Sequence, residues 1–256
     1  MLLAIDAGNT NVTIGVFDGP LLRTRWRLRT VADQTADEWG LKFRELLASE
    51  GLSTAQIDAT MVSSVVPPLE TSLSAMARRY LLHEPIFVTG RTETGLNILY
   101  DNPREVGADR IVNAVAALHK YGGPCIVVDL GTAITFDAVS GNSEYLGGII
   151  CPGIGISISG LFTKTARLPM VDFREPEKLI GTNTVGSIQS GIYYGAIGMI
   201  DGILERLIAE MGGNVKTVAT GGQASLITRG SQFVKTADDD LTLEGLRLIW
   251  ERNHAQ

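Results

Sequence analysis

Hydrophobic and polar residues alternate through the first thirty positions of the chain. Three stretches show this alternation, which is typical of strands with one buried face: LLAID, TIGVFD and LRTRWRL. They predict three short antiparallel strands. The polar segment that follows begins with Thr35-Ala-Asp-Glu38, the pattern of a capping box, and predicts a helix over 36–49 that closes at Gly51.

Strands and helices then alternate as far as residue 119. Apolar runs predict strands at 59–66 and 85–89, and helical spacing predicts helices at 70–81 and 109–119. Pro67-Pro68 ends the first of these two strands. Such alternation indicates an α/β layered fold.

The second half of the chain repeats the pattern of its beginning. Ile5-Asp6-Ala7-Gly8-Asn9-Thr10 has its counterpart in Val128-Asp129-Leu130-Gly131-Thr132-Ala133, 123 positions further on. Each is an apolar strand that ends in Asp-x-Gly and leads to a second strand. A match in strand, turn and following strand at half the chain length predicts two duplicated domains with a boundary near residue 115.

The rest of the second half predicts a strand pair ending at residue 150 and helices at 157–166, 185–211 and 240–253. The helix at 185–211 carries five glycines, and each glycine costs a helix about 1 kcal/mol relative to alanine. Close packing compensates such a cost. Two explanations stay open: tight burial of this helix within the chain, or a subunit interface.

Composition excludes several classes of function. The chain has 256 residues, 45% of them hydrophobic, with a formal net charge of −6 and a pI near 5.1, so it lacks the basic surface of a nonspecific nucleic-acid binder. Its start, MLLAID, does not resemble a signal peptide, and we expect no membrane segment. Cys125 and Cys151 lie in apolar runs, which predicts buried free thiols rather than a disulfide or a metal pair, in a cytoplasmic protein.

The two Asp-x-Gly turns predict a nucleotide site. Glycine lets backbone N–H groups approach a phosphate closely, and the side chains beside these turns add donors: Asn9, Thr10, Asn11 and Thr132. We expect Asp6 and Asp129 to face each other across an interdomain cleft. Two carboxylates beside a polyphosphate are suited to hold a cation directly or through water, because Mg²⁺ keeps several of its waters.

Other nucleotide-binding signatures are missing. The chain has no Gly-x4-Gly-Lys-Ser/Thr sequence, and Gly153-Ile-Gly155 lacks the third glycine of a dinucleotide-binding turn. The Thr220-Gly-Gly222 turn would suit a close passage under an adenosine. The three histidines have no metal-ligand spacing, and the run 238–240 predicts a solvated helix start.

An acid and a base stand side by side in Gly107-Ala108-Asp109-Arg110, close to the predicted boundary. Phosphoryl transfer to a hydroxyl needs a carboxylate that accepts its proton and a cation near the developing charge. Asp109 and Arg110 offer both.

Five motifs in order resemble those of the type III pantothenate kinases, members of the actin, sugar-kinase and Hsp70 ATPase superfamily that are similar to the Bvg accessory factor group. They are Asp6-x-Gly-Asn-Thr10, Gly107-x-Asp-Arg110, Asp129-x-Gly-Thr-Ala133, Gly147-Gly-x-Ile-x-Pro-Gly153 and Thr220-Gly-Gly222. The resemblance implies two ribonuclease-H-like domains, 1–114 and 115–256, a homodimer, and ATP-dependent phosphorylation of the 4′ hydroxyl of pantothenate, the first step of coenzyme A synthesis.

The resemblance also implies roles for individual residues. The ATP phosphates would be held by Asp6, Ala7, Gly8, Asn9, Thr10, Asn11, Val12 and Thr13 with Thr132, and Gly221 and Gly222 would also contact ATP. Pantothenate would be bound by Tyr100, Gly107, Ala108, Asp109 and Arg110, with Asp109 as the proton acceptor. Asp129 would coordinate a potassium or ammonium ion, Mg²⁺ would accompany ATP near Asp6, and Thr184 would contact pantothenate in the partner subunit's site, beside a dimerisation helix.

Two other readings of the motifs stay open at this point. A kinase could act on another small hydroxylated metabolite, because the ATP motifs say little about the acceptor. A nucleotide-binding regulator could use the same fold as a switch, although such a protein could lose the Gly-x-Asp-Arg segment that this chain retains.

Overall fold

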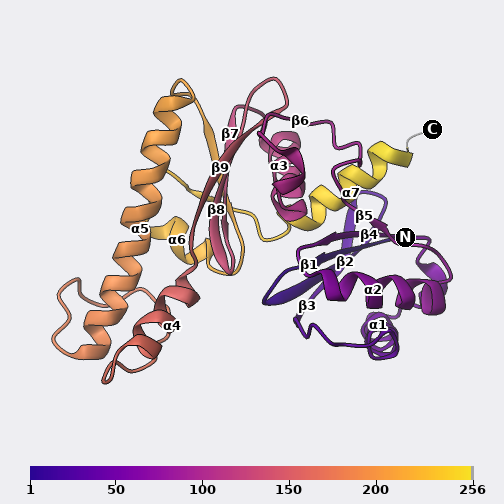
Figure 1. Ribbon diagram of the computed structural model, residues 1–256, viewed down its shortest axis with the longest axis horizontal. Coiled ribbons are helices and arrows are strands. Elements are labelled where there is room, and N and C mark those ends of the chain that lie inside the picture. Colours follow the sequence, from indigo (N-terminus) through magenta and orange to yellow (C-terminus); the bar gives the residue numbers. More distant parts are fainter. Residues whose placement is uncertain (255–256) are drawn as a thin grey trace. The chain divides into compact units, whose positions relative to one another are not determined.

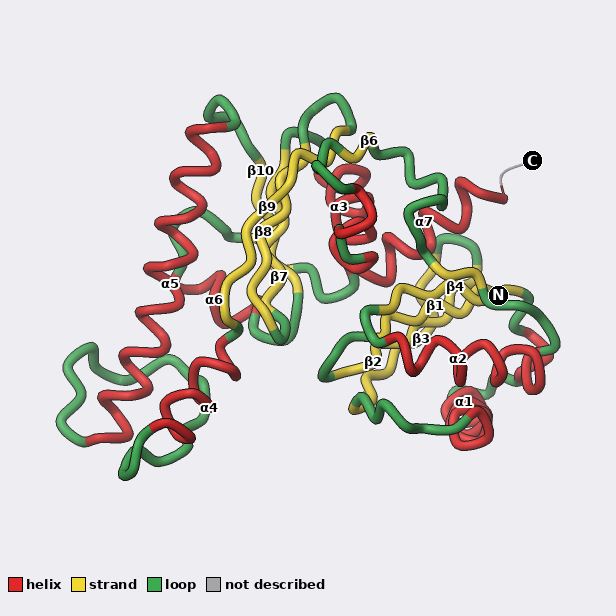
Figure 2. The backbone as a smooth tube through the Cα atoms, in the orientation of Figure 1, coloured by secondary structure: helices red, strands yellow, loops and turns green. Residues whose placement is uncertain are grey.

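The structure, a computed structural model, describes residues 1–254 and divides into two compact units (Figures 1 and 2). The first unit consists of Met1–Leu96, Asp101–Ala116 and the C-terminal segment from Leu241. The second consists of Asn97–Tyr100 and Ala117–Asp240. The chain therefore passes from one unit to the other four times.

A five-stranded sheet in the order β3-β2-β1-β4-β5 forms the centre of the first unit. β1 pairs with β2 antiparallel and with β4 parallel. The strands are β1 (Leu2–Ala7), β2 (Asn11–Asp18), β3 (Leu21–Arg29), β4 (Ala59–Ser64) and β5 (Ile86–Phe87). The three antiparallel strands predicted from the alternating pattern are confirmed.

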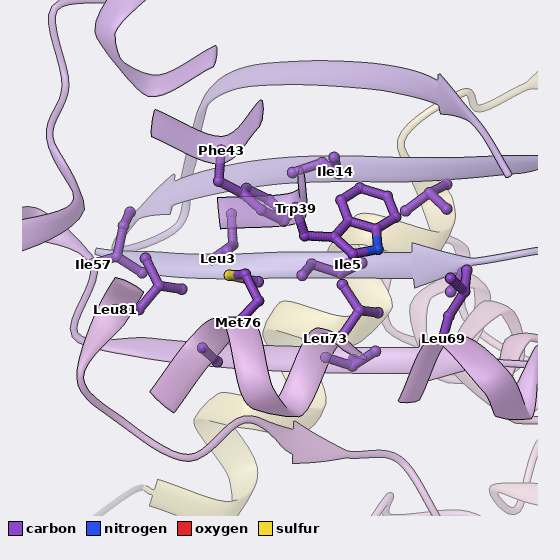
Figure 3. Close-up of a cluster of buried hydrophobic side chains, with 14 of the residues drawn as sticks. Leu3, Ile5, Ile14, Trp39, Phe43, Ile57, Leu69, Leu73, Met76 and Leu81 are labelled. Carbon is purple, nitrogen blue, oxygen red and sulfur yellow. The ribbon is translucent and has the colours of Figure 1, made fainter. Parts of the chain in front are cut away.

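Helices cover both faces of this sheet. On one face, Leu3 and Ile5 of β1 pack against α1 (Ala36–Ser49) and α2 (Pro67–Met76), whose Trp39 and Met76 are fully buried in the core of Figure 3. On the other face, a second core joins alternate β1 residues to α3 (Ala108–Tyr121) and α7 (Leu241–His254). Because side chains alternate along a strand, Asp6 falls on the face that α3 and α7 cover.

Local sequence signals explain the two helices of the first core. The capping box of α1 is formed: the Thr35 hydroxyl accepts a hydrogen bond from the Glu38 backbone, and the Glu38 carboxylate accepts one from the Thr35 backbone. α2 begins earlier than predicted, at Pro67, because proline fits the first turn of a helix as well as the end of a strand. A π-helical turn at Ala77–Leu81 continues it.

The second unit repeats the strand order of the first. Its sheet runs β11-β10-β7-β8-β9-β6, and β7 pairs with β8 antiparallel and with β10 parallel, as β1 does with β2 and β4. The strands are β6 (Asn97–Ile98), β7 (Cys125–Leu130), β8 (Ala133–Val139), β9 (Glu144–Pro152), β10 (Lys216–Thr220) and β11 (Thr236–Ala237). The predicted duplication is therefore present in the topology.

Three helices share one apolar core with this second sheet: α4 (Ile154–Lys164), α5 (Thr184–Glu210) and α6 (Ala224–Gly230). Buried residues of α5 such as Tyr193, Ile200 and Leu204 contribute to it. α5 lies along one side of the unit in Figure 1. Its length matches the predicted helix at 185–211.

Four of the five glycines of α5 do not serve packing within the chain. Side chains added at Gly191, Gly195 and Gly198 would meet nothing within 4 Å, and one at Gly202 would approach only Arg206 of the same helix. The explanation by tight intrachain burial is therefore wrong for these four positions. The alternative, a subunit interface, stays a prediction.

The compact units differ from the predicted domains in the placement of the last helix. The sequence assigned α7 to a domain covering 115–256, but Leu243 and Leu246 of α7 pack in the core of the first unit with Phe17. Thr242 also donates a hydrogen bond to Asn113 of α3 at 2.7 Å. Amphipathic spacing shows that a helix buries one face, but not which sheet receives it.

Candidate active site

The turn between β1 and β2 exposes a set of polar side chains. Asp6 is half-buried near the end of β1, whereas Asn9, Thr10 and Asn11 are exposed. Hydrogen bonds close the turn from within, since the Gly8 N–H donates to the Asn11 carbonyl at 3.0 Å and the Thr30 hydroxyl donates to the Gly8 carbonyl at 2.6 Å. The exposed amide and hydroxyl groups can therefore meet a ligand.

The remaining residues of the predicted phosphate-binding segment are buried or half-buried. Ala7 and Val12 are fully buried in the first core, and Thr13, the register partner of Asp6 on β2, is half-buried. The side chains of Ala7 and Val12 thus fix the turn to the sheet, and only their backbones are available to a nucleotide.

The turn between β7 and β8 is shorter. Asp129 is half-buried, and Gly131 and Thr132 are exposed. Thr220, at the end of β10, is the register partner of Asp129, so the Gly221-Gly222 turn follows at the same edge of the sheet. The structure therefore brings together Asp129, Thr132 and Gly221 within the second unit.

Two glycines make this close arrangement possible. A side chain at Gly221 would lie 2.7 Å from an Asp129 carboxylate oxygen, and the φ of Gly221 is +89°. A side chain at Gly153 would lie 2.0 Å from the Thr132 carbonyl oxygen. Gly153 was not among the candidate site residues, and its signal in the sequence is the Pro152-Gly153 pair that ends β9 and begins α4.

Asp109 lies in the first turn of α3, with its carboxylate folded back on the helix end. It accepts a hydrogen bond from the Arg110 backbone N–H at 2.8 Å, and a side chain at Gly107 would lie 2.5 Å from the same carboxylate oxygen. Burial raises the pKa of Asp109, while the Arg110 backbone and charge act in the opposite direction. Its carboxylate is thus more basic than an ordinary aspartate, which suits a proton acceptor.

Arg110 is 7% exposed, so its guanidinium is almost entirely inside the protein. The N-terminal part of α3, with Ala108 and Val112, belongs to the core on the sheet face to which Asp6 also belongs. Within the first unit, Asp109 and Arg110 therefore belong to the helix that covers the sheet face of Asp6.

Tyr100 belongs to the second unit, whereas the rest of the predicted pantothenate segment, Gly107 to Arg110, belongs to the first. The short strand β6 pairs with β9 in parallel and carries Tyr100 to the edge of the second sheet. The expected interdomain cleft stays a prediction.

Thr184, the first residue of α5, lines a cavity of about 790 Å³ in the second unit. The other lining residues come from α4, from the loop before α5 and from the start of α5: Leu161, Leu168, Gly181, Thr182, Asn183, Ser187, Ile188, Gly191 and Ile192. Thr184 is exposed, and the Asn183 side chain caps the helix by accepting from the Gly186 N–H at 2.8 Å.

One sequence-based interpretation is wrong. Asp238, read as part of a solvated acidic run, is 7% exposed and accepts hydrogen bonds from Lys120 at 2.6 Å and from the Tyr121 hydroxyl at 2.7 Å. It fixes the end of α3 to the segment before α7. A run of charges does not reveal that one member is buried by partners far away in the sequence.

One histidine and the two cysteines lie in surroundings that do not indicate a catalytic role. His83 lies between the Thr60 hydroxyl at 2.8 Å and the Leu81 carbonyl at 3.1 Å, in agreement with its lack of assigned chemistry. Both cysteines are free; Cys125 is buried, which raises its pKa to about 11, and Cys151 is half-buried.

Among residues 1–254, no helix has the length and apolar character needed to cross a membrane.

The two sheets share one order of five strands, and an aspartate lies near the end of the corresponding strands β1 and β7. This arrangement is the two-domain ribonuclease-H-like fold of actin-like ATPases and sugar kinases. A Baf family protein from Campylobacter jejuni is similar over 99% of this chain and 100% of its own, with a TM-score of 0.62 and 20% identity. An activator of 2-hydroxyisocaproyl-CoA dehydratase from Clostridium difficile, solved with bound ADPNP, has a TM-score of 0.58 at 13% identity and covers 100% of this chain and 96% of its own.

Sequence comparison identifies the family. A family model described as type III pantothenate kinase matches residues 2–206. A type III pantothenate kinase of Solibacter usitatus (strain Ellin6076) is 60% identical over 256 residues, which cover 100% of this chain and 98% of that protein. The chain belongs to the type III pantothenate kinase family, enzymes that phosphorylate pantothenate with ATP in the first step of coenzyme A biosynthesis.

Proposed function

We propose that this chain transfers the γ-phosphoryl group of ATP to the 4′ hydroxyl of pantothenate, with Asp109 as the proton acceptor. The observation that carries the proposal is the half-buried Asp109 carboxylate beside the buried Arg110, at the start of the helix that covers the sheet face of Asp6. The hydroxyl oxygen bonds to the γ-phosphorus as the bond to the β–γ bridging oxygen breaks. The proton passes to Asp109, and the products are 4′-phosphopantothenate and ADP.

The two Asp-x-Gly turns serve the nucleotide in this proposal. Donors of the first turn, from Asp6 to Thr13, bind the ATP phosphates, and Thr132 of the second turn also contacts them. The exposure of Asn9, Thr10, Asn11 and Thr132 supports this assignment, because a phosphate needs accessible donors. Gly221 and Gly222 present bare backbone to the nucleotide.

The donor set fits the proposed cations. Asp129 and Asp6 are half-buried carboxylates at turns, and both Mg²⁺ and K⁺ take oxygen ligands. Among the described residues, no three His, Cys, Asp or Glu side chains form a cluster, which suits ions that bind chiefly through phosphate and water. When bound, Mg²⁺ offsets phosphate charge; Asp129 would hold the potassium or ammonium ion and Asp6 would contact Mg²⁺ through water.

Pantothenate is assigned to Tyr100, Gly107, Ala108, Asp109 and Arg110. Arg110 supplies a permanent positive charge for an anionic substrate or for the charge that develops in the transition state. The preformed hydrogen bond from the Arg110 backbone orients the Asp109 carboxylate before substrate arrives.

The acceptor specificity is tested by incubating the protein with Mg-ATP and a panel of small hydroxylated metabolites while ADP release is recorded. We expect pantothenate to stimulate release by at least tenfold over every other acceptor. Equal or greater stimulation by another alcohol would contradict the assignment.

We also propose that the chain is a cytoplasmic homodimer joined along α5, with Thr184 contacting pantothenate in the partner subunit's site. The open glycine positions of α5 lie near apolar side chains that are well exposed in the single chain. These include Leu161, Phe162, Leu179, Ile180, Val185 and Tyr194, with exposures from 37% to 80%. A second copy of the chain would cover this apolar surface and would allow close approach at the glycines.

The dimer is tested at Gly195, where an added side chain meets nothing in the single chain. Gly195→Glu introduces a charge at the proposed contact, so we expect it to shift the mass in light scattering from dimer to monomer at micromolar concentration. Gly195→Ala, the matched comparison, adds only a methyl group at the proposed contact, so we expect it to weaken the dimer less than Gly195→Glu does. A dimeric Gly195→Glu variant would place the interface elsewhere.

A further inference from the structure

One face of the second sheet carries a row of polar side chains. Ile134 and Phe136 of β8 point into the core shared with α4, α5 and α6, so the alternate residues Thr135 and Asp137 lie on the opposite face. Asp129 is the register partner of Thr135 and falls on this same face. The row therefore begins at the proposed cation ligand.

The row continues with a fully buried pair. Tyr145 and Asp137 are both 0% exposed, and the Tyr145 hydroxyl donates to the Asp137 carboxylate at 2.6 Å. The Thr135 hydroxyl donates to the other carboxylate oxygen at 3.2 Å. A hydrogen bond of this length inside a protein holds the phenol ring in one orientation.

The Tyr145 ring in turn contacts Tyr100. The two ring centroids are 6.4 Å apart with an interplanar angle of 54°, and a side chain at Gly147 would lie 3.7 Å from the Tyr100 ring. The backbone connects the same residues, since the Leu99 N–H donates to the Tyr145 carbonyl at 2.9 Å. Tyr100 thus rests on a buried tyrosine and on bare glycine backbone.

We propose that the Tyr145–Asp137 pair is a positioning device that holds Tyr100 in the orientation that binds pantothenate. This inference rests on the proposed assignment of Tyr100 to the pantothenate site. Tyr145 and Asp137 act through Tyr100 and do not touch the substrate. They therefore increase the affinity for pantothenate and leave the affinity for ATP unchanged.

The test is Tyr145→Phe, which removes the hydroxyl that donates to Asp137 and keeps the ring. We expect the KM for pantothenate to rise about tenfold, while kcat and the KM for ATP stay within about twofold. Thr135→Val is the matched control, because it removes another donor to the same carboxylate without contacting Tyr100. It is expected to change the pantothenate KM less than twofold.

Tyr100→Leu tests the substrate role of Tyr100 separately from the positioning role of Tyr145. If this variant leaves the pantothenate KM unchanged, the assignment of Tyr100 fails, and the positioning role fails with it. If it raises the pantothenate KM while Tyr145→Phe does not, only the positioning role fails. In the Tyr100→Leu background, Tyr145→Phe should have no further effect on pantothenate.

Two further outcomes would overturn the inference. One is an equal rise in the pantothenate KM for Thr135→Val and Tyr145→Phe, and the other is a parallel rise in the KM for ATP. If Tyr145→Phe does not fold, the double variant Tyr145→Phe/Asp137→Asn is compared with Asp137→Asn. This comparison again measures how the pantothenate KM depends on the Tyr145 hydroxyl. In that pair the buried carboxylate is replaced in both proteins, so none is left short of a donor, and the same tenfold difference is expected.

Discussion

The two Asp-x-Gly hairpins share a framework but differ in their surroundings. β1 and β7 have the same burial sequence, with four buried residues before a half-buried aspartate. Three residues, Gly8 to Thr10, join β1 to β2, whereas only Gly131 and Thr132 join β7 to β8. The first turn carries three exposed polar side chains, whereas the backbone at Gly153 and Gly221 closely approaches the second turn.

The difference indicates a division of labour between duplicated halves. An open turn with exposed amide and hydroxyl groups is suited to donate hydrogen bonds to a flexible polyphosphate. An enclosed carboxylate beside bare glycine backbone is suited to hold an ion and a nucleotide at short range. The half-buried Asp109 lies outside both hairpins, at the start of α3, and it is the group assigned to the chemistry.

The largest effect is expected on kcat, from a substitution that removes the proposed proton acceptor and leaves ATP binding intact. Asp109→Asn keeps the shape of the side chain and removes its capacity to accept a proton, so kcat should fall by about 100-fold or more. The KM for ATP should stay within about threefold. Asp101→Asn, at an exposed position in the same segment, is the control and should retain full turnover.

Steady-state kinetics of the three proteins decide this prediction. Turnover of Asp109→Asn within about threefold of the parent would remove Asp109 from the reaction.

The next largest effect should distinguish the two hairpins directly. In Gly221→Ala the new methyl group would lie 2.7 Å from the Asp129 carboxylate at a φ of +89°, whereas in Gly8→Ala it would lie 3.1 Å from the Asn11 carbonyl. We expect kcat/KM for ATP to fall about 30-fold in Gly221→Ala and about fivefold in Gly8→Ala. The opposite order, measured under identical conditions, would show that the second turn is the more tolerant one.

A smaller effect should locate the monovalent cation. Asp129→Ala removes the enclosed carboxylate, so the stimulation of turnover by potassium should fall about tenfold or vanish. The measurement is turnover against potassium concentration at constant ionic strength, with choline as the balancing cation. An unchanged potassium dependence would place the ion away from the second hairpin.

The smallest effect concerns stability and pH. Because burial raises the pKa of Asp109 in the folded protein, its protonated form favours folding below the unfolded pKa, and this contribution is lost as pH rises through the folded pKa. At pH 7 the charged form is therefore unfavourable in the fold, and Asp109→Asn should melt about 2 °C higher than the parent.

That difference should shrink as the pH is lowered to about 3.5, where the carboxyl is mostly protonated in both states. Thermal unfolding at the two pH values, with Asp101→Asn alongside, measures it. A lower melting temperature for Asp109→Asn at pH 7 would contradict the cause given for the pKa.

Local signals in the sequence predicted the elements well. Alternation located the strands of both hairpins, and the Thr35–Glu38 capping box located the start of α1. The repeat of Asp6 at Asp129 predicted the duplicated topology, because strand, turn and following strand are all encoded within a dozen residues.

Features that depend on contacts between distant parts of the chain could not be predicted from local sequence patterns. β6 has only two residues, too few for a periodic signal, yet it places Tyr100 on the second sheet. Asp238 is buried by Lys120 and Tyr121, which precede it by more than a hundred positions. The packing of α7 on the first sheet likewise depends on which apolar face is left uncovered by the rest of the chain.

The most direct test of the central claim is ADP release from Mg-ATP in the presence and absence of pantothenate, with the fate of the γ-phosphate followed by a label. We predict that ADP forms only when pantothenate is present and that the label is recovered on pantothenate in a one-to-one ratio with ADP. Equal ADP release without pantothenate, or label recovered solely as inorganic phosphate, would contradict the account.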